Sequence, residues 1–244
     1  MPLELFKNLT TEADSVGIGA LTLASRGEPL LHPDIIEMLD HVKDMFIEKK
    51  INTNATRLDR EVGRKILESG FNHIVFSCDS HIKEEYEELR VGGVFEEVLK
   101  NISEFWDLRC SKEFKELPIR VSISGVKMRQ TQDEEEFSKF WGKYCDDAYM
   151  LPAEERWDTY NNKPHSDLVQ SCVYPWERMY IWHDGTINPC DVDYKSALSG
   201  GKYQDLGSIH NAWASLEKIR LTHINGDRAC LVPCDRCGVS HPRR

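Results

Sequence analysis

Apolar residues in the first 150 positions alternate between short β-like runs and helical spacing. The β-like runs predict strands at residues 17–24, 49–53, 73–77, 118–126 and 147–151. Apolar side chains three and four residues apart predict intervening helices at residues 33–42, 59–69, 95–106 and 133–144. Strands that alternate with helices are typical of an α/β fold with a parallel sheet, in which ligands bind at the carboxyl ends of the strands.

The pattern changes beyond a polar segment at residues 152–170. Asp184-Gly185 separates the apolar runs 178–182 and 186–188, which predicts a β-hairpin. A helix is expected from about residue 212 to Gly226, with Asn211 as its N-cap. We expect its buried side to carry Trp213, Leu216 and Ile219. The last third of the chain therefore predicts a small α+β module.

This small module contains Cys172, Cys190, Cys234 and Cys237. The last two form a Cys-x-x-Cys pair, and the first two lie far from it along the chain, so the chain must fold back to bring the four together. Four thiolates around one point match either a structural zinc ion or an iron–sulfur cluster. A module with little core would gain much of its order from such a centre.

The remaining cysteines have simpler interpretations. Cys78, Cys110 and Cys145 stand singly among apolar or helical residues, and we expect them to be small buried hydrophobic side chains. Cys230 lies near the terminal pair and is a reserve ligand. Eight cysteines in a chain expected in the cytoplasm do not predict four disulfides, because that compartment keeps thiols reduced.

Charge and hydropathy narrow the possible partners. A net charge of -10 over 244 residues argues against a nucleic-acid or an anionic membrane surface. No apolar run is long enough to span a bilayer, and the N-terminal residues show no signal peptide. We therefore expect a cytoplasmic protein with neither nucleic-acid nor membrane partners.

Two groups of residues together resemble the radical S-adenosylmethionine (SAM) enzymes. In the first group, residues 25–33 look like the turn that holds the SAM amino group after the second barrel strand of that family. Residues 51–55 and 77–79 match the ends of the next two strands, and Arg90 falls where an arginine often pairs with the methionine carboxylate. The resemblance thus implies SAM-binding residues Gly27, Glu28, Pro29, Thr53, Asn54, Ser77, Asp79 and Arg90.

The second group resembles the C-terminal auxiliary-cluster domain of these enzymes, the SPASM domain or its shortened twitch form. It comprises residues 172–176, 181–185 and 189–191 and the Cys234/Cys237 pair. The resemblance implies a single auxiliary [4Fe–4S] cluster held by Cys172, Cys190, Cys234 and Cys237, with structural zinc as the alternative. It divides the chain into a partial barrel at 1–151, a linker at 152–170 and the auxiliary-cluster domain at 171–244.

The chain departs from the family pattern at its beginning. Members of the family hold their catalytic cluster with a Cys-x-x-x-Cys-x-x-Cys loop after the first strand, and no such triplet occurs here. We therefore expect a partial (β/α)6 barrel without its first strand, from a late start codon or a fragmented gene. A second, catalytic [4Fe–4S] cluster is expected only if the missing N-terminal segment is present.

The implied chemistry is that of the family. SAM cleavage would generate a 5'-deoxyadenosyl radical that abstracts a substrate hydrogen atom, and the auxiliary cluster would accept the electron left behind. The expected substrate is a small sugar or cyclitol, or a peptide, and the expected electron donor is a flavodoxin or ferredoxin. The alternatives are a non-catalytic iron–sulfur scaffold protein and a zinc-stabilised binding module.

Overall fold

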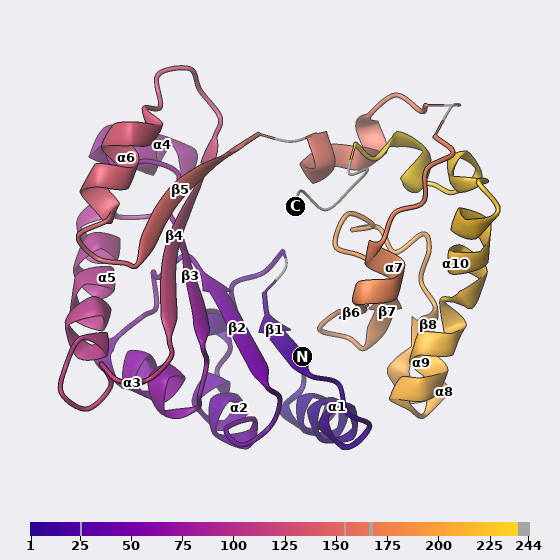
Figure 1. Cartoon of the computed structure of the whole chain (residues 1–244), viewed down its shortest axis with the longest axis horizontal. Helices are drawn as coiled ribbons and strands as arrows, with labels where there is room; N and C mark the ends of the chain where they lie inside the picture. The colour runs from indigo at the N-terminus through magenta and orange to yellow at the C-terminus, as the bar shows by residue number, and fades with distance from the viewer. Residues whose placement is uncertain (25, 154, 166–167, 239–244) are drawn as a thin grey trace. The chain divides into compact units, whose positions relative to one another are not determined.

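The computed structural model describes residues 1–24, 26–153, 155–165 and 168–238, which fall into two compact units (Figure 1). One unit is Asp14–Ala153, and the other joins Met1–Ala13 to the described part of Glu154–Arg244. The first residues of the chain thus group with its last third. The functional domain boundaries at residues 151 and 170 stay a prediction.

The unit of Asp14–Ala153 is built on a parallel sheet. Among the described residues it has five strands, in the order β1-β2-β3-β4-β5. These strands are β1 (Ala20–Leu23), β2 (Glu48–Thr53), β3 (His73–Ser77), β4 (Arg120–Lys127) and β5 (Asp147–Pro152). Each strand pairs with the next one along the chain, so all the carboxyl ends lie at one edge of the sheet. The predicted α/β fold class is confirmed.

Helices connect the strands and lie along one side of the sheet (Figure 1). They are η1 (Pro29–Leu31), α2 (Ile35–His41), α3 (Arg60–Glu68), α4 (Lys83–Leu89), α5 (Phe95–Arg109) and α6 (Glu134–Trp141). The helix predicted at residues 59–69 is α3, and the Asp59 side chain caps it by accepting a hydrogen bond from the Val62 backbone N–H. Helix α4 was not predicted, because it is mostly charged and buries Tyr86 alone.

The helix-covered face of the sheet forms the apolar core. Ile74, Phe76 and Ile123 are fully buried on it. The ring of Phe76 meets that of Phe105 from α5 edge to face, with centroids 5.3 Å apart. The alternation of strand side chains therefore directs the apolar residues of β3 and β4 toward the helices.

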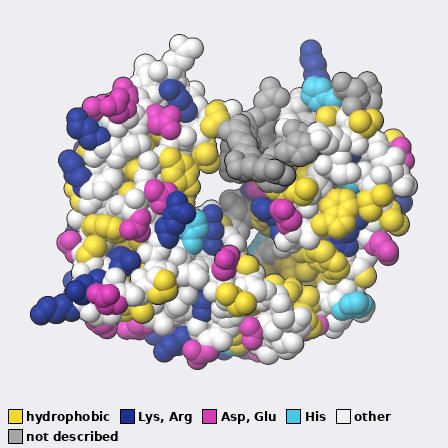
Figure 2. Space-filling model, in the orientation of Figure 1, with side chains coloured by type: hydrophobic (Ala, Val, Ile, Leu, Met, Phe, Trp, Pro, Cys, Tyr) yellow, Lys and Arg dark blue, Asp and Glu magenta, His cyan; other side chains and the backbone are white. Residues whose placement is uncertain are grey.

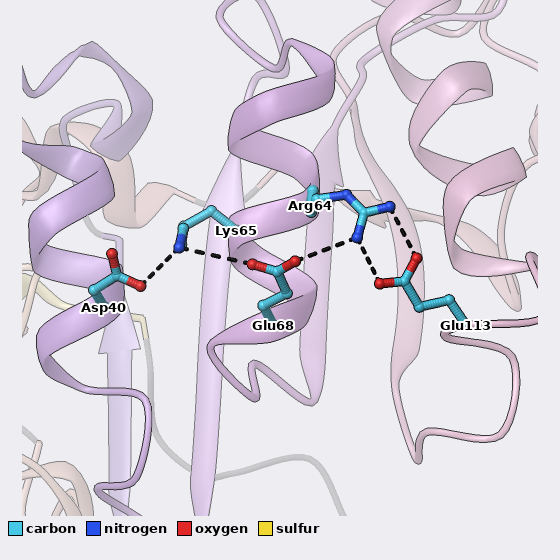
Figure 3. Close-up of polar contacts among 5 residues, drawn as sticks. All are labelled: Asp40, Arg64, Lys65, Glu68 and Glu113. Atoms are coloured by element: carbon cyan, nitrogen blue, oxygen red, sulfur yellow. Dashed lines mark hydrogen bonds and ion pairs between the residues drawn. The ribbon is translucent and has the colours of Figure 1, made fainter.

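A chain of ion pairs ties the outer helices together (Figure 3). Lys65 of α3 lies 2.8 Å from Asp40 of α2 and 3.7 Å from Glu68, which also pairs with Arg64. The Arg64 guanidinium makes two hydrogen bonds to the Glu113 carboxylate beyond α5. These groups are exposed, so water and salt screen them and they add little to stability.

The opposite face of the sheet carries a polar network near the amino ends of the strands. His73 Nε2 lies 3.2 Å from Ser122 Oγ, which donates a hydrogen bond to Asp147. Arg120 donates to the same carboxylate oxygen of Asp147 at 2.9 Å. Burial, with a smaller contribution from Lys50 and Arg120, lowers the pKa of His73. The neutral imidazole is therefore the form that the folded state favours.

The second unit consists of short elements. Its helices are α1 (Leu3–Ser15), η2 (Glu155–Asn161), α7 (Tyr174–Glu177), α8 (Tyr203–Leu206), α9 (Ile209–Ser215), α10 (Glu217–Ile224), η3 (Arg228–Cys230) and η4 (Cys234–Arg236). Its strands are β6 (Tyr180–Ile181), β7 (Thr186–Asn188) and β8 (Gly201–Lys202), which form an antiparallel sheet. The predicted hairpin is β6–β7, with Gly185 in the left-handed region at φ 86°.

Helix α1 holds the C-terminal residues of its unit in place. Leu5 and Leu9 pack against Ile209 at the start of α9. The Glu12 carboxylate accepts hydrogen bonds from the Tyr203 hydroxyl at 2.6 Å and from the Ile209 backbone N–H at 2.9 Å. An acidic side chain thus satisfies an otherwise unpaired donor at the start of a helix.

The single helix predicted from residue 212 is wrong. The first helix, α9, begins earlier than expected, because its N-cap is Ser208 rather than Asn211. The chain then turns at Leu216, where α9 ends and the second helix, α10, begins. Leu216 and Ile219 are buried as expected, but Trp213 is 37% exposed. The Arg220 guanidinium stacks 3.8 Å from the Trp213 ring centroid, and a cation over the ring explains why this tryptophan can stay at the surface.

Charged side chains of both signs are mixed over the visible surface of the sheet-bearing unit (Figure 2). Of the helices in the described ranges, none has the length and apolar character needed to cross a membrane.

Replacing Gly125 by alanine should destabilise the sheet-bearing unit. An added Cβ would lie 2.7 Å from the Cys78 carbonyl oxygen and 3.2 Å from the Phe137 ring, so backbone must move. We expect a loss of about 1–3 kcal/mol in the free energy of unfolding, measured by urea denaturation. Gly27→Ala is the matched control, because its Cβ would meet nothing within 4 Å. Equal stability of the two variants would refute this packing argument.

The stability of the protein should fall as the pH drops below the 6.5 of an unperturbed histidine, partly through His73. The pKa of His73 is lower in the folded state, so the unfolded chain binds more protons between the folded pKa and 6.5. The stabilisation is therefore present above pH 6.5 and is lost as the pH falls toward the folded pKa. Urea denaturation across this range should show a smaller loss for His73→Asn, and identical profiles would contradict the expectation.

Candidate cofactor and metal sites

The Glu28 carboxylate joins the turn after β1 to the end of β2. Its Oε1 accepts hydrogen bonds from the Thr53 hydroxyl at 2.6 Å and from the Leu30 backbone N–H at 3.1 Å. Its Oε2 accepts from the Asn54 backbone N–H at 2.6 Å. The structure therefore brings together Glu28, Thr53 and Asn54, which lie far apart in sequence, at the carboxyl edge of the sheet.

The neighbours of Glu28 shape the same edge. Gly27 is exposed, and Pro29 begins η1 directly after the Glu28 cap. Asn52, one residue before Thr53, has a buried side-chain oxygen with no hydrogen-bond partner among the described residues. A buried acceptor of this kind needs a donor from water or a ligand. The residues present at this edge thus fit a ligand that carries hydrogen-bond donors, such as SAM.

Asp79 and Arg90 face each other after β3. Arg90 Nε lies 2.9 Å from Asp79 Oδ2, and Asp79 Oδ1 accepts from the Val126 backbone N–H. Gln132 donates its side-chain amide to the carbonyl oxygens of Asp79 and Val126. Sequence reasoning missed Gln132, because a glutamine in a loop gives no signal of its position. Ser77 pairs in register with Ser124 across β3 and β4 and is half-buried.

Arg90 therefore has a protein partner in this structure. The resemblance implies that Arg90 binds the methionine carboxylate and that Asp79 faces the nucleoside. Arg90 pairs instead with Asp79, and its side chain is 25% exposed. The exposed part of the guanidinium remains able to accept a second anion, because its fork has five donors.

Four cysteines from distant parts of the second unit line one cavity. They are Cys172 before α7, Cys190 after β7, and Cys234 and Cys237 at the two ends of η4. The rest of the wall is mainly apolar and includes Tyr174, Pro175, Pro189, Val192, Ile219 and Pro233. The fold-back that the spacing of the cysteines requires is thus present.

Two of the cysteines in this cavity, Cys190 and Cys234, have raised pKa values, so their thiol forms are favoured over thiolates. Burial raises the pKa of the Cys190 thiol to about 12, although the Asp193 and Val192 backbone N–H groups lower it. Burial, followed by the thiols of Cys190, Cys237 and Cys172, raises the pKa of Cys234, while Arg228 lowers it. A positively charged centre would remove this mutual repulsion and deprotonate the thiols.

The cavity does not show a formed single-ion site. Within the described ranges, no group of three or more His, Cys, Asp or Glu side chains is arranged to hold a metal ion. The four soft sulfur donors in one apolar cavity fit an iron–sulfur cluster by chemistry, and their role as ligands stays a prediction.

The other cysteines divide between core and surface. Cys78 and Cys145 are buried as expected. Cys110 is exposed, so the expectation that it is a core residue is wrong. It is the C-cap residue of α5, outside the buried face of that helix. Cys230, the reserve ligand, is also exposed and is not among the residues that line the cavity.

Two buried residues of the cavity wall escaped sequence reasoning. His223 and Arg228 are 0% and 1% exposed. Arg228 donates to the carbonyl oxygens of Cys237 at 2.9 Å and Gln170 at 3.3 Å. Both residues lie near Cys234 and Cys237 along the chain, and this proximity was the only sequence signal that we identify for a place in the cavity wall. It was not enough, because a lone histidine or arginine does not indicate burial.

Comparisons with known proteins agree with this architecture. The model of the Radical SAM superfamily matches residues 1–140. The AdoMet-dependent heme synthase of Methanosarcina barkeri is 32% identical over 177 residues, which cover 72% of this chain and 47% of that protein. The chain therefore belongs to the Radical SAM superfamily, as the sequence predicts. It spans between 26% and 52% of the length of the curated relatives that it matches.

Solved structures extend the similarity to the second unit. The structure of BtrN in complex with AdoMet and 2-DOIA has a TM-score of 0.62 and 17% identity, and the match covers 98% of this chain and 80% of BtrN. Streptococcus suis SuiB bound to the precursor peptide SuiA has a TM-score of 0.65 and 13% identity, covering 98% and 69% of the two chains. Both matches show a shared fold, and they confirm the partial radical SAM barrel joined to a small second unit.

Proposed function

We propose that this chain binds SAM at the carboxyl edge of its parallel sheet and holds one auxiliary [4Fe–4S] cluster in the cavity of its second unit. The observation that carries the proposal is the gathering of Cys172, Cys190, Cys234 and Cys237 around one cavity. Membership of the Radical SAM superfamily favours an iron–sulfur cluster over zinc at these thiols.

The chain's own residues would act as positioning groups for SAM. Glu28, held by Thr53 and Asn54, fixes the turn that offers backbone carbonyls to the SAM amino group. Arg90, paired with Asp79 after β3, would use the exposed part of its guanidinium to bind the SAM carboxylate. Gly27 and Pro29 shape the turn, and Ser77 and Asn52 supply polar groups at the ends of β3 and β2.

The proposed reaction is a substrate oxidation that begins with hydrogen-atom abstraction. The bound auxiliary cluster would supply a site that accepts the electron left on the substrate. The cluster that cleaves SAM needs a Cys-x-x-x-Cys-x-x-Cys pattern, which these residues do not contain. We therefore propose for this chain the SAM-binding surface and the auxiliary cluster, and the proposed oxidation needs a radical-generating cluster that these residues do not hold.

The substrate class is a small molecule or a peptide. BtrN is described with 2-DOIA and SuiB with a precursor peptide, and both share the fold of this chain. A reduced flavodoxin or ferredoxin would supply electrons in the cytoplasm. The competing function is a zinc-stabilised or iron–sulfur scaffold without catalysis, which the same four thiols would also permit.

Anaerobic reconstitution with iron and sulfide tests the cluster. We expect a brown protein with about four irons per chain and a matching amount of sulfide. Cys234→Ala should lose most of this iron, because one of the four proposed ligands is removed. Cys110→Ala is the matched control, since Cys110 is exposed and should keep the wild-type content. A colourless wild-type protein that binds one zinc would reject the cluster in favour of the zinc module.

Isothermal titration calorimetry of the reconstituted protein measures its affinity for SAM and tests the proposed binding site. Glu28→Gln replaces one acceptor oxygen by a donor amide, so at least one of the three hydrogen bonds to Glu28 is lost. We expect affinity for SAM to fall by on the order of tenfold. Glu113→Gln, in the exposed ion-pair chain of Figure 3, should bind SAM like the wild type. Unchanged affinity in Glu28→Gln would remove Glu28 from the proposed site.

A further inference from the structure

His223 is a buried histidine in the wall of the cysteine cavity. It lies in α10 and is 0% exposed. Its Nδ1 accepts a hydrogen bond from the Cys172 backbone N–H at 3.1 Å, and its carbonyl oxygen accepts one from the Ser171 hydroxyl at 2.6 Å. The Trp176 ring meets the imidazole edge to face, with centroids 6.2 Å apart. The hydrogen bond at Nδ1 and the contact with the Trp176 ring thus fix the orientation of the imidazole.

The hydrogen bond to Nδ1 determines where the ring carries its proton. A nitrogen that accepts from a backbone N–H cannot itself hold a hydrogen, so the neutral ring is protonated at Nε2. Nε2 is buried and has no hydrogen-bond partner among the described residues. A buried N–H donor without an acceptor destabilises the folded state, so we expect a partner for it.

His223 lines the cavity, so a group bound there can supply an acceptor for Nε2–H. The wall around His223 offers the sulfur atoms of Cys172, Cys190, Cys234 and Cys237, and most of its remaining side chains are apolar. Arg228, also in the wall, donates its two terminal guanidinium nitrogens to the Cys237 and Gln170 carbonyl oxygens. A sulfur-rich centre in this cavity would present acceptors to Nε2–H.

We propose that His223 donates its Nε2–H to a sulfur atom of the metal centre held by Cys172, Cys190, Cys234 and Cys237. The inference rests on the proposed function of this cavity as an iron–sulfur site. His223 is then a positioning residue with two roles. Its Nδ1 anchors the backbone of the ligand Cys172, and its Nε2–H stabilises negative charge on the cluster.

The second role has a measurable consequence. Reduction adds negative charge to the sulfur atoms of a cluster, and a hydrogen bond to sulfur therefore favours the reduced state. The His223 donor should raise the reduction potential and make the auxiliary cluster a better electron acceptor. Arg228, a second buried donor beside Cys237, acts in the same direction through its charge.

Two conservative variants separate the two nitrogens of the ring. His223→Asn places its amide oxygen near the position of Nδ1, so it can keep the bond from Cys172 N–H while removing the donor toward the cavity. His223→Gln places its amide nitrogen near the position of Nε2 and keeps that donor. The experiment reconstitutes both variants and the wild type without oxygen, then follows the reduced-cluster signal by electron paramagnetic resonance during a redox titration.

We expect the potential of His223→Asn to shift to a more negative value and that of His223→Gln to stay closer to the wild type. Equal potentials in all three proteins would overturn the hydrogen bond while leaving the cluster itself established. A wild type that assembles no cluster would instead reject the proposed function on which the inference rests.

A spectroscopic measurement covers the case in which a variant fails to assemble. Resonance Raman spectra of the wild-type cluster should show iron–sulfur stretching bands that shift in heavy water, because deuterium replaces the hydrogen that Nε2 donates. Bands that do not shift would overturn the proposal. Strong hyperfine coupling to a histidine nitrogen would also overturn it, since it would make His223 a direct ligand.

Discussion

The second unit depends on placing four thiol groups in one cavity that is otherwise mostly apolar. Burial and repulsion from neighbouring thiols raise the pKa values of Cys190 and Cys234, so the unit would gain free energy if a positive centre stabilised their thiolates. The secondary structure around the cavity is short, with helices of a single turn at α7 and η4. Elements of this length cannot form a large core, and a bound cluster would supply the missing cohesion.

The sheet-bearing unit separates its apolar core from a polar edge at the carboxyl ends of its strands. Its apolar core lies on the helix-covered side, which leaves the carboxyl ends of the strands free for polar side chains. Glu28 fixes the turn after β1 to the end of β2, and Asp79 does the same between β3 and the end of β4. These carboxylates hold separate strand ends in register, and a preorganised edge is what a cofactor-binding surface needs.

Prediction from sequence worked where local chemistry decides the outcome. The helix predicted from residue 59 begins where Asp59 caps α3, and the predicted Asp184-Gly185 turn forms the β6–β7 hairpin, because each acts within a few residues. Prediction failed where distant partners decide. Trp213 looked like a core residue by spacing, but Arg220 covers it at the surface. The first helix groups with the last third of the chain through Glu12, which no local pattern reveals.

The sequence by itself determined the alternation of strands and helices and the identity of four cysteines whose spacing demands a fold-back. It also carried the turn and strand-end residues by which the family is recognised. The tertiary structure alone decided that Arg90 pairs with Asp79 and that His223 lines the same cavity as those cysteines, with Nδ1 bonded and Nε2 without a partner among the described residues. Spacing along a chain constrains which residues can meet, whereas the direction of a hydrogen bond depends on packing from every side.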